Sequence, residues 1–322
     1  GDWKWFNALG SLSDRYAKFY LAVQKEAEKI DPNATVMGFA YANFTDPPRK
    51  TKLNNRVIIV HVPNFMFPFT KEKLDREHKQ WDAWGKTGAN MLLRPNYLLQ
   101  LHSMPLFLAR KFGDDFQYLS GQGLIATAFD SLTGQWSTQG PNLYMLGRLQ
   151  TQPKKTVDEI LEEYYGGFGR AKDAVRKYFH HWEVVSDAMT DASIAEAVAN
   201  HGNPNPTFGF LVYAHTIFTP GVMSKGRALL TKAQVAAKGD PSAEERVAFL
   251  VRGLRRAELT LAAQTAFRDC KENQSDPTFQ AAVKKLDSYR RSVDTKDADN
   301  VSWVFWFEGR RWDRKKVYKS ID

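Results

Sequence analysis

Polar and aromatic residues follow each of four short apolar runs in the first half of this 322-residue chain. Asparagine, arginine and aspartate offer paired hydrogen-bond donors or acceptors, which suit the recognition of neighbouring hydroxyl groups. Tyrosine and tryptophan add a flat apolar ring with a polar edge, and such rings stack on the C–H faces of sugars. The candidate substrate-binding residues are Tyr41, Asn43, His61, Asn64, Arg94, Asn96, Tyr97, Gln135 and Trp136.

Asp130 is the candidate catalytic carboxylate, because it comes directly after the apolar run 125–129. A carboxylate in such a position can transfer a proton or stabilise charge on a bound substrate. Its alternative role is a cap or a loop hydrogen bond. Arg94 is equally suited to a structural salt bridge, and His61, inside an apolar run, to a core histidine.

The apolar runs predict buried strands that alternate with helical patterns. Continuous apolar runs between helices are typical of a parallel sheet with both faces covered. The sequence predicts adjacent parallel strands over 35–41, 56–62, 90–94 and 123–129, and helices over 13–30, 70–86 and 104–119. Active sites lie at the carboxyl ends of such strands. We therefore expect Tyr41, Asn64, Arg94, Asp130 and Trp136 to converge in one pocket.

Beyond Pro141 the strand patterns nearly vanish and helical spacing dominates. Helices are predicted over 142–149, 156–165, 169–199, 220–238, 242–273 and 277–292, with a loop over 201–206. The stretch 300–307 is rich in tryptophan and phenylalanine and is predicted to be extended. The chain thus divides into an α/β region over 1–150, a helical region over 151–299, and an aromatic and basic extended segment over 300–322.

The composition excludes several classes of protein. The net charge is +9, with 45 Lys+Arg against 36 Asp+Glu, and the densest basic run is 310–316. No nucleic-acid motif accompanies the charge, so no nucleic-acid partner is expected, whereas a basic surface suits an anionic polysaccharide. The sequence lacks an apolar stretch long enough to span a membrane. The single Cys270 excludes an internal disulfide, and the scattered histidines show no metal-ligand spacing, so we expect no metal and no cofactor.

The order of segments up to residue 183 resembles the domain-of-unknown-function 4838 family. The matching segments are 12–20, 31–33 leading to 38–41, 94–96, the strand ending at Asp130, and 163–171. That family includes members assigned as endo-β-N-acetylglucosaminidases and is related to the β-hexosaminidase and α-glucuronidase barrels. The resemblance implies a (β/α)8 TIM-type barrel whose fifth to eighth strands are the four predicted here. The chain would hold the C-terminal half of that barrel, followed by the helical region; an open, doubly wound sheet is the alternative.

The resemblance also implies a glycoside hydrolase that cleaves a polysaccharide or N-glycan by acid/base chemistry, in the periplasm or outside the cell. In the related barrels the acidic pair lies just upstream of the segment that 13–20 resembles, where Asp2 is the sole carboxylate. We therefore expect the family's general acid to be absent, and an N-terminal barrel half or a companion chain to supply it. The alternatives are a non-catalytic glycan-binding or scaffold protein, and a polysaccharide lyase that acts on an anionic glycan with Tyr41 or His61 as the base.

Overall fold

The computed structural model describes residues 11–64, 67–98, 103–130, 132, 134–200 and 210–293. The chain divides into two compact units, which we describe separately. The sheet unit comprises Gly1–Tyr97 and Asp114–Leu132, and the helical unit comprises Leu98–Gly113 and Thr133–Asp322. The predicted extended segment 300–322, with its basic run, lies outside the described residues.

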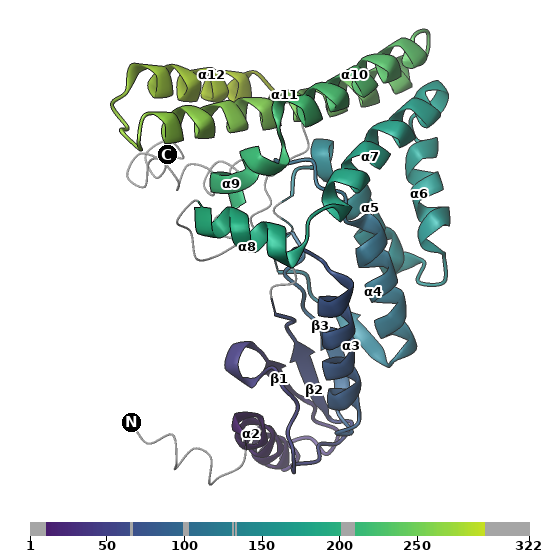
Figure 1. Cartoon of the computed structure of the whole chain (residues 1–322). Helices are drawn as coiled ribbons and strands as arrows, with labels where there is room; N and C mark the ends of the chain where they lie inside the picture. The colour runs from purple at the N-terminus through teal and green to yellow at the C-terminus, as the bar shows by residue number, and fades with distance from the viewer. Residues whose placement is uncertain are drawn as a thin grey trace. The chain divides into compact units, whose positions relative to one another are not determined.

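The sheet unit is built on a four-stranded parallel sheet with the strand order β1-β2-β3-β4 (Figure 1). Its strands are β1 (Val36–Ala40), β2 (Val57–His61), β3 (Asn90–Leu93) and β4 (Leu124–Thr127). The prediction of an α/β chain with four adjacent parallel strands is confirmed. The pairing of β3 with β4 shifts register between Met91 and Leu92, so Ile125 is an extra residue in β4.

Helix α2 (Leu12–Ala27) precedes the sheet, and the short 3-10 helix η1 (Ala42–Phe44) lies between β1 and β2. Helix α3 (Lys71–Gly85) connects β2 to β3, and α4 (Ala109–Gly121) connects β3 to β4. The boundary between the two units falls within α4. A strand order without reversal, joined by right-handed crossovers, places all the connecting helices on one face of a sheet.

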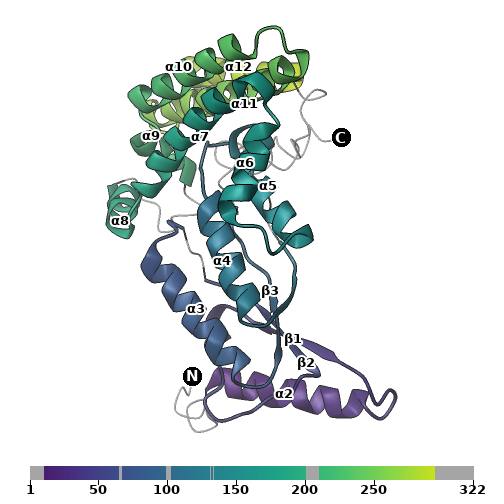
Figure 2. The same ribbon diagram turned by 90° about the vertical axis from the view of Figure 1, so that its right-hand side faces the viewer.

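Figure 2 shows α2 and α3 beside the strands, and their side-chain contacts place both helices on the same face of the sheet. The Tyr20 hydroxyl of α2 donates a 2.8 Å hydrogen bond to the Phe39 carbonyl, and the Tyr20 ring lies against Gly38, where a Cβ atom would come within 2.5 Å of the ring. Only glycine therefore fits at this position. The buried ring of Trp81, from α3, meets the His61 ring of β2 edge to face at 5.8 Å.

Asp14 ties the start of α2 to the loop that leads into β2. Its carboxylate completes a capping box with Ser11 and accepts hydrogen bonds of 3.0, 2.9 and 2.8 Å from the backbone N–H groups of Arg49, Lys50 and Thr51. Burial alone would raise the pKa of Asp14, but the hydrogen bonds from Ser11, Lys50 and Thr51 outweigh it and hold the pKa well below its ordinary value. The ionised carboxylate is therefore a structural anchor.

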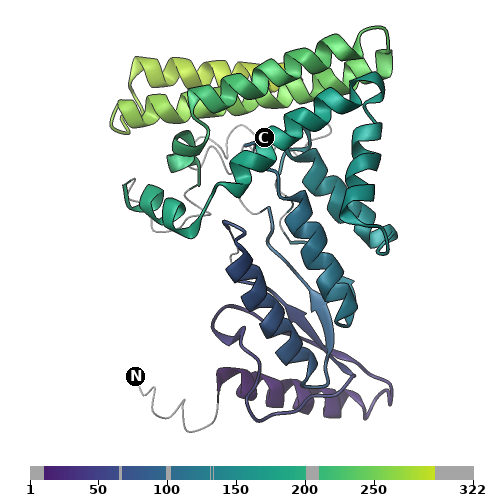
Figure 3. The same cartoon turned by 45° about the vertical axis from the view of Figure 1, so that its right-hand side comes forward.

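The helical unit contains eight further α-helices among its described residues. They are α5 (Trp136–Thr151), α6 (Val157–Gly166), α7 (Lys172–Asp187), α8 (Asp191–Asn200), α9 (Phe210–Ile217), α10 (Pro220–Ala237), α11 (Pro241–Asp269) and α12 (Pro277–Val293), with a 3-10 turn η2 (Gly169–Ala171). Helices α10 and α12 both pack along α11 (Figure 3). Trp182 of α7 is fully buried against Gly226 of α10, where a Cβ atom would clash with the indole. Close helix packing thus requires a glycine there.

The predicted helix over 104–119 begins later than expected. It starts at Ala109, because Pro105 lacks an N–H group and disfavours the helical conformation at Met104. The next N–H groups bond to distant side chains instead: Phe107 donates to Ser186 Oγ at 2.9 Å and Leu108 to Asn142 Oδ1 at 2.8 Å. These tertiary hydrogen bonds outweigh the local helical pattern.

The prediction of one continuous helix over 169–199 is also wrong. This segment is divided into η2, α7 and α8. A new helix begins after Thr190, because the Ser193 N–H donates to Thr190 Oγ1 at 3.1 Å while the Thr190 N–H donates to Ser193 Oγ at 3.0 Å. This reciprocal pair caps the start of α8. Helix α9 was not predicted at all.

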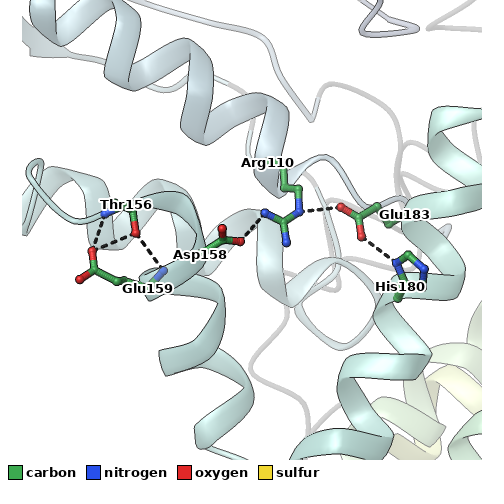
Figure 4. A network of polar contacts seen from close by, with 6 residues as sticks. All are labelled: Arg110, Thr156, Asp158, Glu159, His180 and Glu183. Carbon is green, nitrogen blue, oxygen red and sulfur yellow. Dashed lines mark hydrogen bonds and ion pairs between the residues drawn. The ribbon is translucent and has the colours of Figure 1, made fainter.

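A polar network ties together the helical-unit end of α4, α6 and α7 (Figure 4). The Arg110 guanidinium pairs with Asp158 at 2.6 Å and with Glu183 at 2.8 Å, and His180 contacts the other oxygen of Glu183 at 3.1 Å. Arg110 and Asp158 are exposed, so water screens their attraction. The arrangement orients helices and offers no nucleophile or paired acids to a substrate.

Candidate functional site

One face of the sheet carries a row of exposed apolar side chains. Along β1 and just after it, Met37, Phe39 and Tyr41 point away from α2 and are 60%, 44% and 49% exposed, whereas Gly38 and Ala40 face the helix and are buried. Three large apolar side chains exposed in a row form a candidate interaction surface.

On the neighbouring strands the same face is apolar but buried, since Val60, Val62 and Leu92 are 2%, 1% and 9% exposed. The register places Val60 of β2 beside Phe39, and Leu92 of β3 beside Val60. Val60, Val62 and Leu92 form an apolar cluster, against which Ile58 packs. We define the open face as the exposed row Met37, Phe39 and Tyr41.

Arg94 and Asp130 lie together at the carboxyl ends of β3 and β4. Arg94 Nη2 is 2.8 Å from Asp130 Oδ1, and both side chains are partly exposed. The Arg94 guanidinium also lies 5.9 Å from the centre of the Phe39 ring, which places this ion pair beside the open face. The Arg94 N–H donates to the His61 carbonyl at 2.8 Å and so continues the sheet ladder. The salt bridge considered for Arg94 is therefore formed, with Asp130 as its partner.

The remaining strand-end residues differ in exposure. Tyr41 directly precedes η1, and Asn43 lies within it. Asn43 after β1 and Asn64 after β2 are exposed. Asn96 after β3 is half-buried, and its Oδ1 atom accepts no hydrogen bond from the described residues. The amide groups of these asparagines follow the same carboxyl ends of the strands as Tyr41 and Arg94.

Tyr97 is buried and serves the scaffold. Its hydroxyl donates to Asp115 of α4, and the other oxygen of that carboxylate lies 2.7 Å from His78 Nε2 of α3. The His78 ring stacks on Tyr118 with ring centres 3.8 Å apart. Burial first, and the Asp115 charge second, raise the pKa of the Tyr97 hydroxyl well above its ordinary value. Tyr97 therefore remains protonated and fixes the loop after β3 to α3 and α4.

His61 is buried too, with 1% of its side chain exposed. Its Nε2 atom is 3.5 Å from Glu77 Oε2, and its ring meets Trp81. This is the core position considered for it from the sequence. In this conformation the His61 side chain has no exposed atom that could contact a glycan directly.

Gln135 and Trp136 belong to the helical unit. Gln135 is fully buried at the start of α5, and its Nε2 donates to Ser137 Oγ at 2.7 Å. Trp136 is 41% exposed. Gln135 therefore supports the first turn of α5, while Trp136 keeps a ring face that a ligand could contact.

The sequence reasoning missed Phe39, Met37 and the pair His78–Asp115. Phe39 and Met37 could have been found from the alternation of large and small residues over 37–41, which indicates one exposed and one packed face. Asp115 occupies an apolar position of α4, three residues after Phe112 and four before Leu119. A carboxylate in such a position requires a buried partner.

The described part of the chain shows neither a group of metal ligands nor a membrane-spanning helix. No group of three or more His, Cys, Asp or Glu side chains there could hold a metal ion. No helix there is long and apolar enough to cross a bilayer.

The comparisons with known proteins place the chain by family alone. Neither the curated proteins nor the solved structures contain a match. The model of the family described as Domain of unknown function (DUF4838) matches residues 4–180, which include the whole sheet, the open face and the Arg94–Asp130 pair. This match agrees in extent with the resemblance seen in the sequence up to residue 183. The chain belongs to the DUF4838 family.

Proposed function

We propose that this chain is the C-terminal half of a (β/α)8 barrel and that it contributes the sugar-binding part of a glycoside hydrolase. The observation that carries the proposal is the position of exposed Phe39 and Tyr41 beside the Arg94–Asp130 ion pair, at the carboxyl ends of parallel strands. Aromatic rings with neighbouring polar forks are the usual means of holding a sugar ring.

The topology supports the barrel half of the proposal. A doubly wound sheet requires a reversal of strand order, and the four described strands follow one another without one. Their other face is apolar, and an apolar inward face is what a closed barrel fills with layers of side chains. The outer edges of β1 and β4 pair with no other strand among the described residues, so four more strands could join there.

The chemistry sets a limit on what Asp130 alone can do. Hydrolysis of a glycosidic bond requires a general acid, and either a second carboxylate or the N-acetyl group of the substrate. Asp130, oriented by Arg94, would stabilise positive charge on the sugar or position such an N-acetyl group. The acid would come from the companion half of the barrel. Its substrate would be a polysaccharide or an N-glycan outside the cytoplasm.

A polysaccharide lyase is the second candidate. Tyr41 is exposed, and the Arg94 guanidinium could neutralise a uronate carboxylate on the same face. A lyase uses such a cation together with a tyrosine base. A non-catalytic glycan-binding module would use the same rings and ion pair without turnover.

One experiment separates these functions. The 322-residue chain is incubated with glycans that contain N-acetylglucosamine or uronate, alone and together with the preceding segment of its gene product or a companion chain. We expect new reducing ends only with the companion, and weaker glycan binding when Asp130→Asn is introduced. Unsaturated products that absorb ultraviolet light would identify a lyase, and binding without turnover in both settings would identify a binding module. If no glycan binds in either setting, the proposal is wrong.

A further inference from the structure

A groove of about 430 Å³ lies between α9, α10 and α11 of the helical unit. Its residues follow helical spacing on both long helices, so one stripe of each helix forms a wall. The stripes are Pro220, Met223, Ser224 and Arg227 on α10, and Arg255, Glu258, Leu261, Ala262, Thr265 and Arg268 on α11; His215 and Phe218 close the side at α9.

Positive charge gathers at one end of this groove. Arg227 pairs with Glu258, and Arg255 Nη1 lies 3.5 Å from the other oxygen of Glu258. The Glu258 side chain is 11% exposed, whereas Arg227 is 57% and Arg255 39% exposed. Two guanidinium groups therefore share one nearly buried carboxylate. One positive charge is left in excess, on groups that still present N–H donors to the solvent.

The middle of the groove is apolar. Met223 and Leu261 are buried and form its apolar floor, and Ala262, also in the lining, is exposed. At the far end Arg268 pairs with Asp269 at 2.8 Å. Arg255 and Arg268 are thirteen positions apart on one helix, which corresponds to about 20 Å along its axis.

We propose that this groove binds a small amphipathic anion, namely a carboxylate on an apolar body. The head group would accept hydrogen bonds from Arg227 and Arg255, whose planar forks match a carboxylate. The apolar body would lie over the exposed Ala262 and over Met223 and Leu261, which are already 7% and 8% exposed, so most of the apolar area removed from water is that of the ligand itself. The volume is that of a small-molecule site. Phe218 in its wall is 3% exposed and offers no open ring face on which a sugar could stack, so this site is independent of the glycan function proposed above.

The test is calorimetric titration of the whole chain with decanoate below its micellar concentration. Decanol has the same apolar body without the charge, and acetate has the charge without the body. We expect saturable binding of one decanoate per chain, with at least about tenfold weaker binding of either reference compound. Decanol that binds as tightly as decanoate, or an absence of saturable binding, would overturn the proposal.

Variants locate the site. Arg255→Gln should weaken decanoate binding about threefold to tenfold, because it removes one charged donor. Ala262→Glu, at an exposed position, should weaken it further by placing a negative charge over the apolar floor. Arg176→Gln is the matched control, since Arg176 is 38% exposed, also pairs with acidic side chains, and lies elsewhere in the same unit. Equal loss in Arg176→Gln and Arg255→Gln, with circular dichroism unchanged in both, would remove the groove as the site.

Discussion

The sheet unit and the helical unit differ in what they leave uncovered. The sheet unit exposes Met37, Phe39 and Tyr41 in one row, next to a charged pair. The described part of the helical unit exposes large apolar side chains such as Val184 and Val235 singly, on different helices, while Trp182 is fully buried. Helices can turn their apolar stripes toward one another, whereas β1 packs one face on α2 and exposes the other. On the neighbouring strands Val60, Val62 and Leu92 are buried, so the exposed part of the sheet is limited to β1 and its end.

The same difference separates polar groups that a ligand can reach from those engaged within their own unit. Asp130 and Arg94 lie beside the uncovered face, where a ligand can reach them. Asp14, Glu163 and the Arg110 network are engaged with residues of their own unit. Variants of the two kinds of residue should therefore differ in their effects on stability and on binding.

Trp182→Ala should cause the largest loss of stability, because it opens a cavity at the contact of α7 with α10. The unfolding free energy of the helical unit should fall by about 3–5 kcal/mol. Urea unfolding followed by far-ultraviolet circular dichroism measures it. Val184→Ala, an exposed change on the same helix, should stay within about 0.5 kcal/mol. If Trp182→Ala lowers the unfolding free energy by less than about 1 kcal/mol, Trp182 is not part of a closely packed core.

Asp14→Asn should destabilise the sheet unit by about 1.5–3 kcal/mol at pH 7, since a buried charged acceptor of several hydrogen bonds is lost. The folded-state pKa of Asp14 is lowered, so its stabilisation is complete above the ordinary value of about 4 and is lost as the pH falls below that value. The variant should therefore lose less stability on acidification than the parent chain. The control Asp31→Asn alters an exposed turn carboxylate. If the unfolding free energies of the parent chain and of Asp14→Asn fall equally as the pH is lowered, Asp14 is not a structural anchor.

Glu163→Gln should cost at most about 1 kcal/mol, although Glu163 contacts Lys155, Tyr144 and Arg148. The hydrogen bonds from Lys155 and Tyr144 lower its pKa to about 2, so its contribution is lost as the pH falls from about 4.3 towards 2. About a third of the side chain is exposed, and salt should screen the interaction. Melting temperatures of parent and variant should converge in 1 M sodium chloride, whereas the Asp14→Asn difference should persist. If the difference in melting temperature between parent and Glu163→Gln is unchanged by salt, the contacts of Glu163 are not the screened surface interactions described here.

Phe39→Ala should have the smallest effect on stability, within about 0.5 kcal/mol, because the ring lies on an uncovered face. If the glycan proposal is correct, binding of a glycan identified with the parent chain should weaken about fivefold to tenfold. Ile125→Ala removes another exposed apolar side chain of the sheet unit and is the matched control for both measurements. A loss of more than about 2 kcal/mol would mean that Phe39 is part of a core, and unchanged glycan affinity would separate it from binding.

The sequence predicted the sheet well because its signals are local. Apolar runs between helical patterns indicated all four strands. The rule that site residues follow the carboxyl ends of parallel strands also predicted that Arg94 and Asp130 lie close together, as they do. The rule could not say which face each side chain takes. His61, the last residue of β2, points into the packing with α3, because a shift of one position along a strand reverses the face. Tyr97, in the loop after β3, is buried against α4.

The errors in the helical half have a different origin. Residues 104–108 carry a helical pattern, but their N–H groups find partners in Ser186 and Asn142, far away in the sequence. The break before α8 depends on a short capping pair, Thr190 and Ser193, which a continuous apolar stripe conceals. Long-range hydrogen bonds and caps of this kind leave little trace in hydrophobic spacing.

The register shift in β4 has a consequence for how copies of this chain behave at high concentration. An irregular strand with an extra residue at Ile125 is a poor template for a further strand. The regular, five-residue β1, with Met37 and Phe39 beside its edge, is a good one. Unwanted filament growth in a concentrated preparation should therefore start at β1, and a lysine in place of exposed Met37 should delay precipitation more than the same change at Ile125.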